Sequence, residues 1–136
     1  MGVRPVYLLD THVVLWLWGD PDRIDTTLRD ELAHPQTRLL VSAVSAMEVA
    51  TKTRLGKLDI GHTLMPTWAA RVTETAAEEL PLSTAHALLG GSLAWDNRDP
   101  FDRLIVAQAL TEGVRLVSAD RTMSQVVGLR VVNPAA

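Results

Sequence analysis

The chain has 136 residues and a formal net charge of −3, which fits one domain over residues 1–136 with a substantial core. It contains no cysteine, and this excludes a disulfide scaffold, a zinc–thiolate site and a cysteine nucleophile. The opening residues, MGVRPVYLLDTH, turn acidic too early for a signal peptide, and no apolar run is long enough to span a bilayer. We therefore expect a soluble cytoplasmic protein with no membrane partner.

Hydrophobic patterning predicts strands that alternate with helices along the chain. In chain order, we expect a strand at 6–9, helices at 10–18 and 22–33, a strand at 38–41, helices at 45–55, 67–77, 84–89 and 100–112, and strands at 114–117 and 129–132. Short strands that are apolar at nearly every position are typical of a parallel sheet covered on both faces. The order indicates an α/β fold built in layers around such a sheet.

Two aspartates fall just after strands of the predicted sheet. Asp10 ends the segment VYLLD, and Asp120 ends the segment RLVSAD. Ligands of open α/β sheets bind outside the carboxyl ends of the strands, so both aspartates are candidate ligand residues. Asp10 or Thr11 is equally suited to cap the following helix. The residues themselves leave these two roles open.

Glu48 lies within a largely apolar helical pattern, SAVSAMEVATKTRLGK. Ser45 and Glu48 match a capping box, and Glu48 is placed to pair with Lys52 one turn further along. An acid on a buried face costs free energy unless it is paired or coordinated. The pattern slightly favours a structural role for Glu48 and leaves a ligand role open.

The segment RDPFDRLIVAQA holds two aspartates at the start of a predicted helix. Asp99 is a good N-cap, because Pro100 then occupies the first helical position. Asp102 falls in the first turn, where the helix dipole favours negative charge. One cap is sufficient for a helix. We therefore expect Asp99 to cap the helix and Asp102 to point at a ligand.

A ligand for several converging acids is expected to be a cation. Two carboxylates 4 Å apart repel by roughly 4 kcal/mol at an effective dielectric constant of about 20, so ionised acids that share a site need a counter-charge. Oxygen ligands select hard ions such as Mg²⁺ or Mn²⁺. These acids are far apart in the sequence, so their convergence is a prediction about the tertiary structure.

Taken together, these segments resemble PIN-domain ribonucleases over essentially the whole chain, and most closely the VapC-type toxins of bacterial toxin–antitoxin pairs. The segments LLDTHVVLWLW, VSAVSAMEVATKTRLGKL, DPFDRLIVAQAL and RLVSAD are similar to the four motifs of that family, in order. The acids of the family then fall on Asp10, Glu48, Asp102 and Asp120. The chain differs from many relatives in carrying Asn97 where they have histidine and Met47 where they have tryptophan, and neither change removes an acid.

The resemblance implies a PIN-like three-layer fold, with a small parallel sheet of about five strands between helices. It implies a metal-dependent endoribonuclease that uses one or two Mg²⁺ or Mn²⁺ ions to hydrolyse RNA phosphodiester bonds. Asp10, Glu48 and Asp102 would hold the principal ion, and Asp120 a second ion or the attacking water. Second-rank site candidates are Asp99, Thr11 and Ser118. The implied partners are RNA, a second copy of the chain in a homodimer, and a VapB-type antitoxin that covers the acidic site.

Four further residues are candidates for binding RNA. Lys52, Arg54 and Arg103 lie close to the acidic motifs and are able to contact phosphates, which positions a nucleic acid without reading its sequence. Trp95, in the polar segment AWDNRD, is able to stack on an unpaired base. Each of these residues alone is equally typical of a solvated surface or of packing. Trp16 is expected to contribute to the core or to a dimer contact.

Two alternative functions stay open at this point, and a third is disfavoured. The chain is compatible with a PIN nuclease that processes RNA without a toxin role. It is also compatible with a non-catalytic α/β binding module whose acids are helix caps and surface charges. A phosphoryl-transfer enzyme of the aspartyl-phosphate type needs a second aspartate two residues after the first, where this chain has His12.

Overall fold

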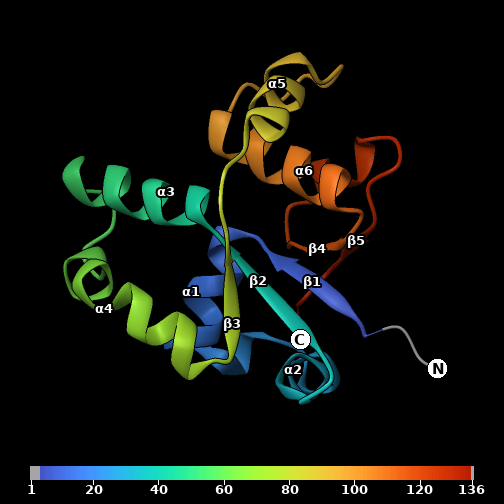
Figure 1. Cartoon of the computed structure of the whole chain (residues 1–136). Coiled ribbons are helices and arrows are strands. Elements are labelled where there is room, and N and C mark those ends of the chain that lie inside the picture. The colour runs from blue at the N-terminus through green and yellow to red at the C-terminus, as the bar shows by residue number, and fades with distance from the viewer. Residues whose placement is uncertain (1–3, 136) are drawn as a thin grey trace.

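A computed structural model describes residues 4–135 of the chain (Figure 1). Five parallel strands form one sheet in the order β3-β2-β1-β4-β5. The strands are β1 (Val6–Leu9), β2 (Arg38–Ser42), β3 (Ala77–Leu80), β4 (Arg115–Val117) and β5 (Val131–Val132). The predicted α/β fold around a parallel sheet of about five strands is confirmed.

Helices connect the strands and cover both faces of the sheet. They are α1 (Thr11–Gly19), α2 (Thr26–Ala33), α3 (Ala43–Arg54), α4 (Gly61–Glu74), α5 (Thr84–Ser92) and α6 (Pro100–Glu112). Two short 3₁₀ turns, η1 (Pro21–Arg23) and η2 (Arg121–Gln125), follow α1 and β4. Within residues 4–135, no helix combines the length and the apolar character needed to cross a bilayer.

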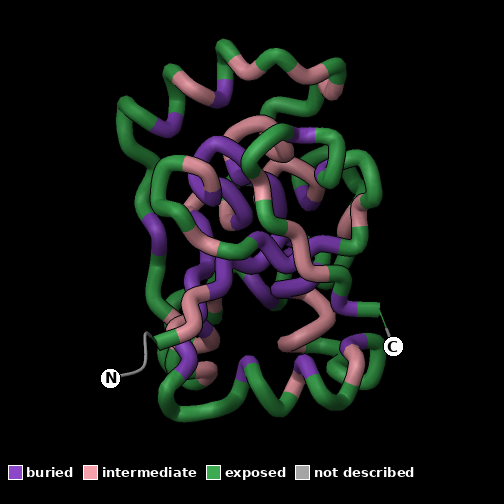
Figure 2. Tube along the Cα trace, turned by 90° about the vertical axis from the view of Figure 1, so that its right-hand side faces the viewer, coloured by how far each residue is buried: buried purple, intermediate pink, exposed green. Residues whose placement is uncertain are grey.

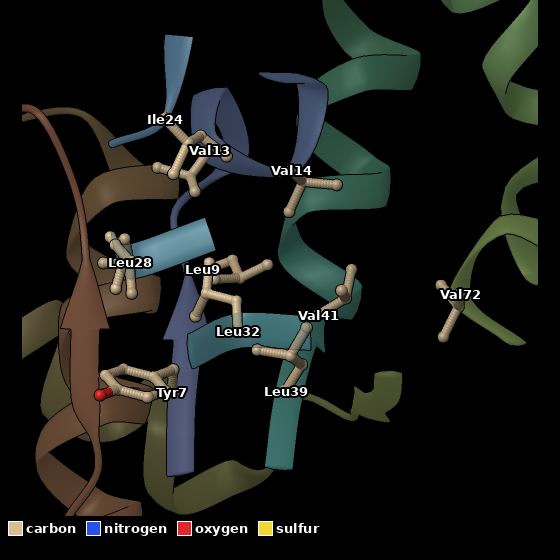
Figure 3. Packing of buried hydrophobic residues seen from close by; sticks show 11 residues of the cluster. Tyr7, Leu9, Val13, Val14, Ile24, Leu28, Leu32, Leu39, Val41 and Val72 are labelled. Atoms are coloured by element: carbon tan, nitrogen blue, oxygen red, sulfur yellow. The ribbon is translucent and has the colours of Figure 1, made fainter. Parts of the chain in front are cut away.

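The two-residue period of the strands divides the core into two halves. On β1, Tyr7 and Leu9 point to one face, where α1, α2 and α4 contribute apolar side chains; Figure 3 shows this cluster. Leu8 points to the opposite face, against α6, η2 and the start of α3. The buried segments therefore lie in the centre of the molecule, between exposed helices (Figure 2). Burial on both faces explains why the central strands are continuously apolar.

Three predicted helices begin more than one residue away from the expected position. The predicted helix 22–33 divides into η1 and α2, because Asp25 caps α2 by accepting a hydrogen bond from the Leu28 N–H. The prediction that Ser45 and Glu48 form a capping box is wrong. Ser42 caps α3 instead, accepting from the Val44 N–H at 3.0 Å. Because Ser42 caps α3 three residues before Ser45, Ser45 lies inside the helix.

The predicted helix 67–77 begins six residues earlier, at Gly61, and contains Pro66. The residues after it form β3, a strand that was not predicted. Its sequence, AEEL, is not continuously apolar, because β3 is at the edge of the sheet and Glu78 and Glu79 are exposed. The bidentate ion pair of Arg38 with Glu78, at 2.8 and 2.9 Å, joins β3 to β2.

The start and end of α6 agree with the prediction. Asp99 caps the helix by accepting from the N–H groups of Phe101 and Asp102, and Pro100 is the first helical residue. Gly113 ends it with a φ of +66°, in the left-handed region that favours glycine. Asp102 is therefore held in the first turn of α6, as expected.

Candidate functional site

The four acids predicted from the sequence line one cavity at the carboxyl edge of the sheet. The cavity has a volume of about 360 Å³. Its lining residues are Asp10, His12, Trp16, Glu48, Lys52, Asp99, Asp102, Ala119 and Asp120. Asp10 follows β1 and Asp120 follows β4, which are neighbours in the sheet. The predicted convergence of the acids therefore occurs in the tertiary structure.

Asp10 is buried and held by two hydrogen bonds. Its Oδ1 accepts from the Thr11 N–H at 2.8 Å, and its Oδ2 accepts from the Ser118 hydroxyl at 2.7 Å. Its own N–H extends the sheet by donating to the Val117 carbonyl. Oδ1 of Asp10 thus caps α1, while Oδ2 is held by Ser118.

The serine and threonine beside Asp10 tie the neighbouring elements together. Ser118 also accepts from the Asp120 N–H through its hydroxyl oxygen, at 3.1 Å. Thr11 bonds through its hydroxyl to the hydroxyl of Ser45, at 2.9 Å, and so links the start of α1 to α3. Both residues are buried. In this structure they orient Asp10, Asp120 and α3.

Glu48 reaches the cavity from the middle of α3 and is only 4% exposed. The ammonium of Lys52, one turn further along α3, lies 2.5 Å from its Oε2. The predicted pairing of these two residues is therefore present. Burial lowers the pKa of Lys52, but the hydrogen bond and charge of Glu48, with Asp99 and Asp102, outweigh this and raise it. Lys52 is thus a cation at the rim of the acidic cavity.

Asp102 is half-buried and surrounded by like charges. Burial raises the pKa of its carboxyl to about 6, the amide of Asn97 opposes this rise, and the charges on Asp99, Asp10 and Glu48 add to it. Burial also raises the pKa of Asp10, against the hydrogen bonds from Ser118 and Thr11. Both carboxylates are therefore less stable as anions here than in water, which favours a bound cation.

The donor set fits a hard divalent cation by its chemistry. The four acids offer carboxylate oxygens, which Mg²⁺ and Mn²⁺ prefer. Within residues 4–135, no three acidic, histidine or cysteine side chains already have the spacing of a metal site. Glu48 is paired with Lys52, so cation binding by Glu48 requires adjustment of the Lys52 side chain. Asp120 caps η2 through Oδ1 and keeps Oδ2 for other contacts.

The pKa of Asp102 leads to a prediction for stability without metal. A folded-state pKa of about 6, above the usual 3.8, means that the folded protein binds more protons between these values, so stability falls as pH rises through this window. The shift corresponds to at most about 3 kcal/mol, and solvent screening of this half-exposed group reduces it to about 1 kcal/mol. We expect Asp102→Asn to raise the melting temperature at pH 7.5 by roughly 3–5 °C.

Thermal melting in EDTA at pH 5 and pH 7.5 tests this expectation. The difference in melting temperature between wild type and Asp102→Asn should be larger at pH 7.5 than at pH 5. A residual pH dependence is expected in the variant, because the pKa of Asp10 is also raised. An equal difference in melting temperature at both pH values would contradict the raised pKa of Asp102.

Three cavity residues, His12, Trp16 and Ala119, were not assigned to the site from the sequence. Trp16, which we expected in the core or in a dimer contact, is half-buried and lines the cavity. The guanidinium of Arg23 lies over its ring, 5.3 Å from the centroid. His12 lines the cavity beside Asp10, as its sequence position allows. The helical period of α1 would have placed His12 and Trp16, four residues apart, on one face.

The candidates for RNA binding lie in different surroundings. Lys52 lines the cavity, whereas Arg54 is exposed at the end of α3 and does not line it. Trp95 borders a second, open cavity of about 550 Å³, lined by the segment that connects α5 to α6 and by Arg103. Arg103 also borders that cavity, but its guanidinium donates four hydrogen bonds to backbone carbonyls. The structure therefore gives Arg103 a structural role.

Comparison with known proteins shows which family the chain resembles. The PIN domain family model matches residues 7–129. Ribonuclease VapC22 of Mycobacterium tuberculosis (strain ATCC 25618 / H37Rv) is 29% identical over 119 residues, which cover 85% of this chain and 88% of that protein.

Solved structures show the same fold. VapBC2 from Rickettsia felis, bound to a DNA fragment from their promoter, matches with a TM-score of 0.68 and 18% identity over 94% of this chain and 98% of that chain. DNA-bound VapBC from Salmonella typhimurium matches with a TM-score of 0.67 and 17% identity over 94% and 97%. At this identity the structural likeness concerns the fold alone. Because the family model spans most of the sequence, the chain belongs to the PIN domain family.

Proposed function

We propose that this protein is a metal-dependent endoribonuclease that acts as the toxin of a toxin–antitoxin pair. The observation that carries the nuclease proposal is the single cavity lined by Asp10, Glu48, Asp102 and Asp120. Membership of the PIN domain family and the similarity to ribonuclease VapC22 support the same activity. The substrate class is RNA, and the bond cleaved is the phosphodiester.

Asp10, Glu48 and Asp102 are the residues that would hold the principal Mg²⁺ or Mn²⁺, with Asp120 beside them for a second ion or for the attacking water. When bound there, a divalent ion would lower the pKa of a water molecule and would stabilise the negative charge on the departing oxygen. The chain's own groups orient the acids, since Ser118 and the Thr11 N–H hold both oxygens of Asp10.

The cations near the cavity have a positioning role in this proposal. The Lys52 ammonium is half-buried against Glu48 and is the cation that lines the cavity with the acids. A phosphate that enters the cavity would exchange the Lys52–Glu48 contact for a Lys52–phosphate contact. Arg54 is exposed at the end of α3, outside the cavity, and is a candidate for contact with RNA phosphates there. Trp95, half-buried at the second cavity, is a candidate stacking residue.

The toxin role is supported by the relatives. The structures that share this fold include VapBC from Salmonella typhimurium and VapBC2 from Rickettsia felis, and a further match is a toxin–antitoxin complex from Klebsiella pneumoniae. We propose a VapB-type antitoxin that inserts a basic side chain into the acidic cavity, because a guanidinium binds carboxylates in a bidentate manner. A homodimer and a cytoplasmic location complete the proposal.

Cleavage of a mixed RNA pool by the purified protein tests the proposed activity. We expect cutting with Mg²⁺ or Mn²⁺ and none with EDTA. The same background with and without metal would overturn the nuclease proposal in favour of a non-catalytic binding module. Cleavage that persists while expression of the chain leaves growth of a bacterial host unaffected would overturn the toxin role and favour a PIN nuclease for RNA processing.

A further inference from the structure

The segment between α5 and α6, residues 93–99, is held from inside by one side chain. Arg103 extends from the first turns of α6 back into this segment and donates to four carbonyl oxygens. They belong to Gly90, Leu93, Trp95 and Asn97, at 2.8, 2.6, 2.8 and 2.8 Å. A guanidinium has five N–H donors in a rigid planar fork, so four fixed acceptors define its position and that of the segment.

Close packing of α5 on α6 supports the same segment. Gly90 is buried in α5, and a Cβ placed there would lie 3.1 Å from the Leu104 Cδ2 and 3.3 Å from the carbonyl oxygen of Arg103. The carbonyl of Gly90 is itself one of the acceptors of Arg103. The segment is thus held to α6 in two ways. Arg103 of α6 binds its backbone carbonyls, and α5, which precedes it, packs closely on α6.

Asn97 connects this segment to the acidic cavity. Its Nδ2 donates to the Oδ2 of Asp102 at 3.0 Å, and its Oδ1 accepts from the Asp99 N–H at 2.8 Å. Only the oxygen end of an amide accepts a hydrogen bond, so the second contact determines which end faces Asp102. Asn97 therefore presents a donor, and not an acceptor, to the carboxylate.

The surroundings of Asp102 explain why such a donor matters. Asp102 shares its cavity with Asp10, Glu48 and Asp99, whose charges raise its pKa. Repulsion from these acids favours rotation of the half-buried carboxylate towards solvent. A hydrogen bond from Asn97 opposes this rotation and keeps Oδ2 at the cavity before any cation is bound.

We propose that Asn97 is a positioning residue that holds Asp102 in the orientation for binding a divalent cation, and that Arg103 holds Asn97 in place. This inference rests on the metal site of the proposed function. Neither residue contacts the cation in the proposal. Arg103 acts through Asn97, and Asn97 acts through Asp102. The arrangement extends from the backbone carbonyls of residues 90–97 to the carboxylate of Asp102.

Calorimetric titration of the metal-free protein with Mn²⁺ tests the inference without measuring cleavage. Loss of a hydrogen bond to a metal-ligating group typically weakens metal binding 10–100-fold, so we expect Asn97→Ala to weaken Mn²⁺ binding by about 10–100-fold. Arg103→Lys keeps the charge but not the planar fork, and should weaken binding in the same direction. Arg98→Ala is the matched control, because Arg98 is exposed in the same segment and donates no hydrogen bond to Asp102; its affinity should equal that of wild type.

The double variant distinguishes the proposed chain of contacts from two independent effects. If Arg103 acts through Asn97, adding Arg103→Lys to Asn97→Ala causes no further loss of Mn²⁺ affinity. If the losses of Mn²⁺ affinity in the two single variants add fully in the double variant, Arg103 does not act through Asn97. Asn97 lies in a loop and is half-exposed, so Asn97→Ala carries the test even if Arg103→Lys fails to fold.

Failure of the inference and failure of the proposed function give different results. Wild-type affinity in Asn97→Ala, while Asp102→Asn loses binding, would overturn the inference alone. Absence of Mn²⁺ binding by the wild-type protein would overturn the metal site of the proposed function and the inference with it. Unchanged melting temperatures would show that lost affinity in Asn97→Ala is not a result of unfolding.

Discussion

Replacement of Asp102 by asparagine is expected to remove metal-dependent RNA cleavage. The change keeps the size and the position of the side chain in α6 but removes a charge from the cavity. Metal-ion catalysis contributes several kcal/mol of transition-state stabilisation, so we expect a loss on the order of 10³-fold in cleavage rate. Initial rates on a defined single-stranded RNA with Mn²⁺, normalised to folded protein, measure this loss.

Asp99→Asn is the matched control for Asp102→Asn. Asp99 lies three residues earlier, caps α6 through its Oδ1 and also lines the cavity. Asparagine caps helices as well as aspartate does, so the fold should be kept. We expect most of the cleavage activity to remain in this variant. An equal loss in the two folded variants would mean that Asp99 is a ligand and that its role as a cap is secondary.

Gly61→Ala is expected to be the most destabilising single-methyl change in the packing of α4 on α3. A Cβ at Gly61 would lie 1.7 Å from the Thr53 Oγ1 and 2.9 Å from its Cβ. Thr53 is buried and donates to the Val49 carbonyl at 2.6 Å, so it has little freedom to move. We expect a loss of about 3 kcal/mol in the free energy of unfolding, measured by urea denaturation.

Gly91→Ala is a control at a second helical glycine. No atom lies within 4 Å of the position that a Cβ would take, and Gly91 is exposed in α5. Alanine is favoured over glycine in helices, so this change should raise stability by about 0.5–1 kcal/mol. Opposite signs of the change in unfolding free energy for the two variants would confirm that α3 and α4 approach closely at Gly61. Similar small effects would contradict that packing.

Local signals predicted much of the fold around the site. Apolar runs predicted β1, β2 and β4, and the sequence Asp99–Pro100 with Gly113 predicted both ends of α6. These signals depend on the backbone preferences of a few neighbouring residues, and tertiary packing does not change those preferences. β3 was missed because an edge strand does not need an apolar sequence. The start of α3 was misplaced because Ser42 and Ser45 are equally good caps locally.

The residues by themselves predicted that Asp102 points at a ligand, but they left the roles of Asp10 and Glu48 open. The set of four acids came from the resemblance of the motifs to those of PIN-domain ribonucleases. Only the tertiary structure brings Ser118 to Asp10, across 108 positions of the chain. It also turns Arg103 inwards to four carbonyls and places Trp16 at the cavity. Local preferences act over a few residues. These contacts instead depend on how whole helices pack on the sheet, because that packing determines which distant side chains and backbone groups become neighbours.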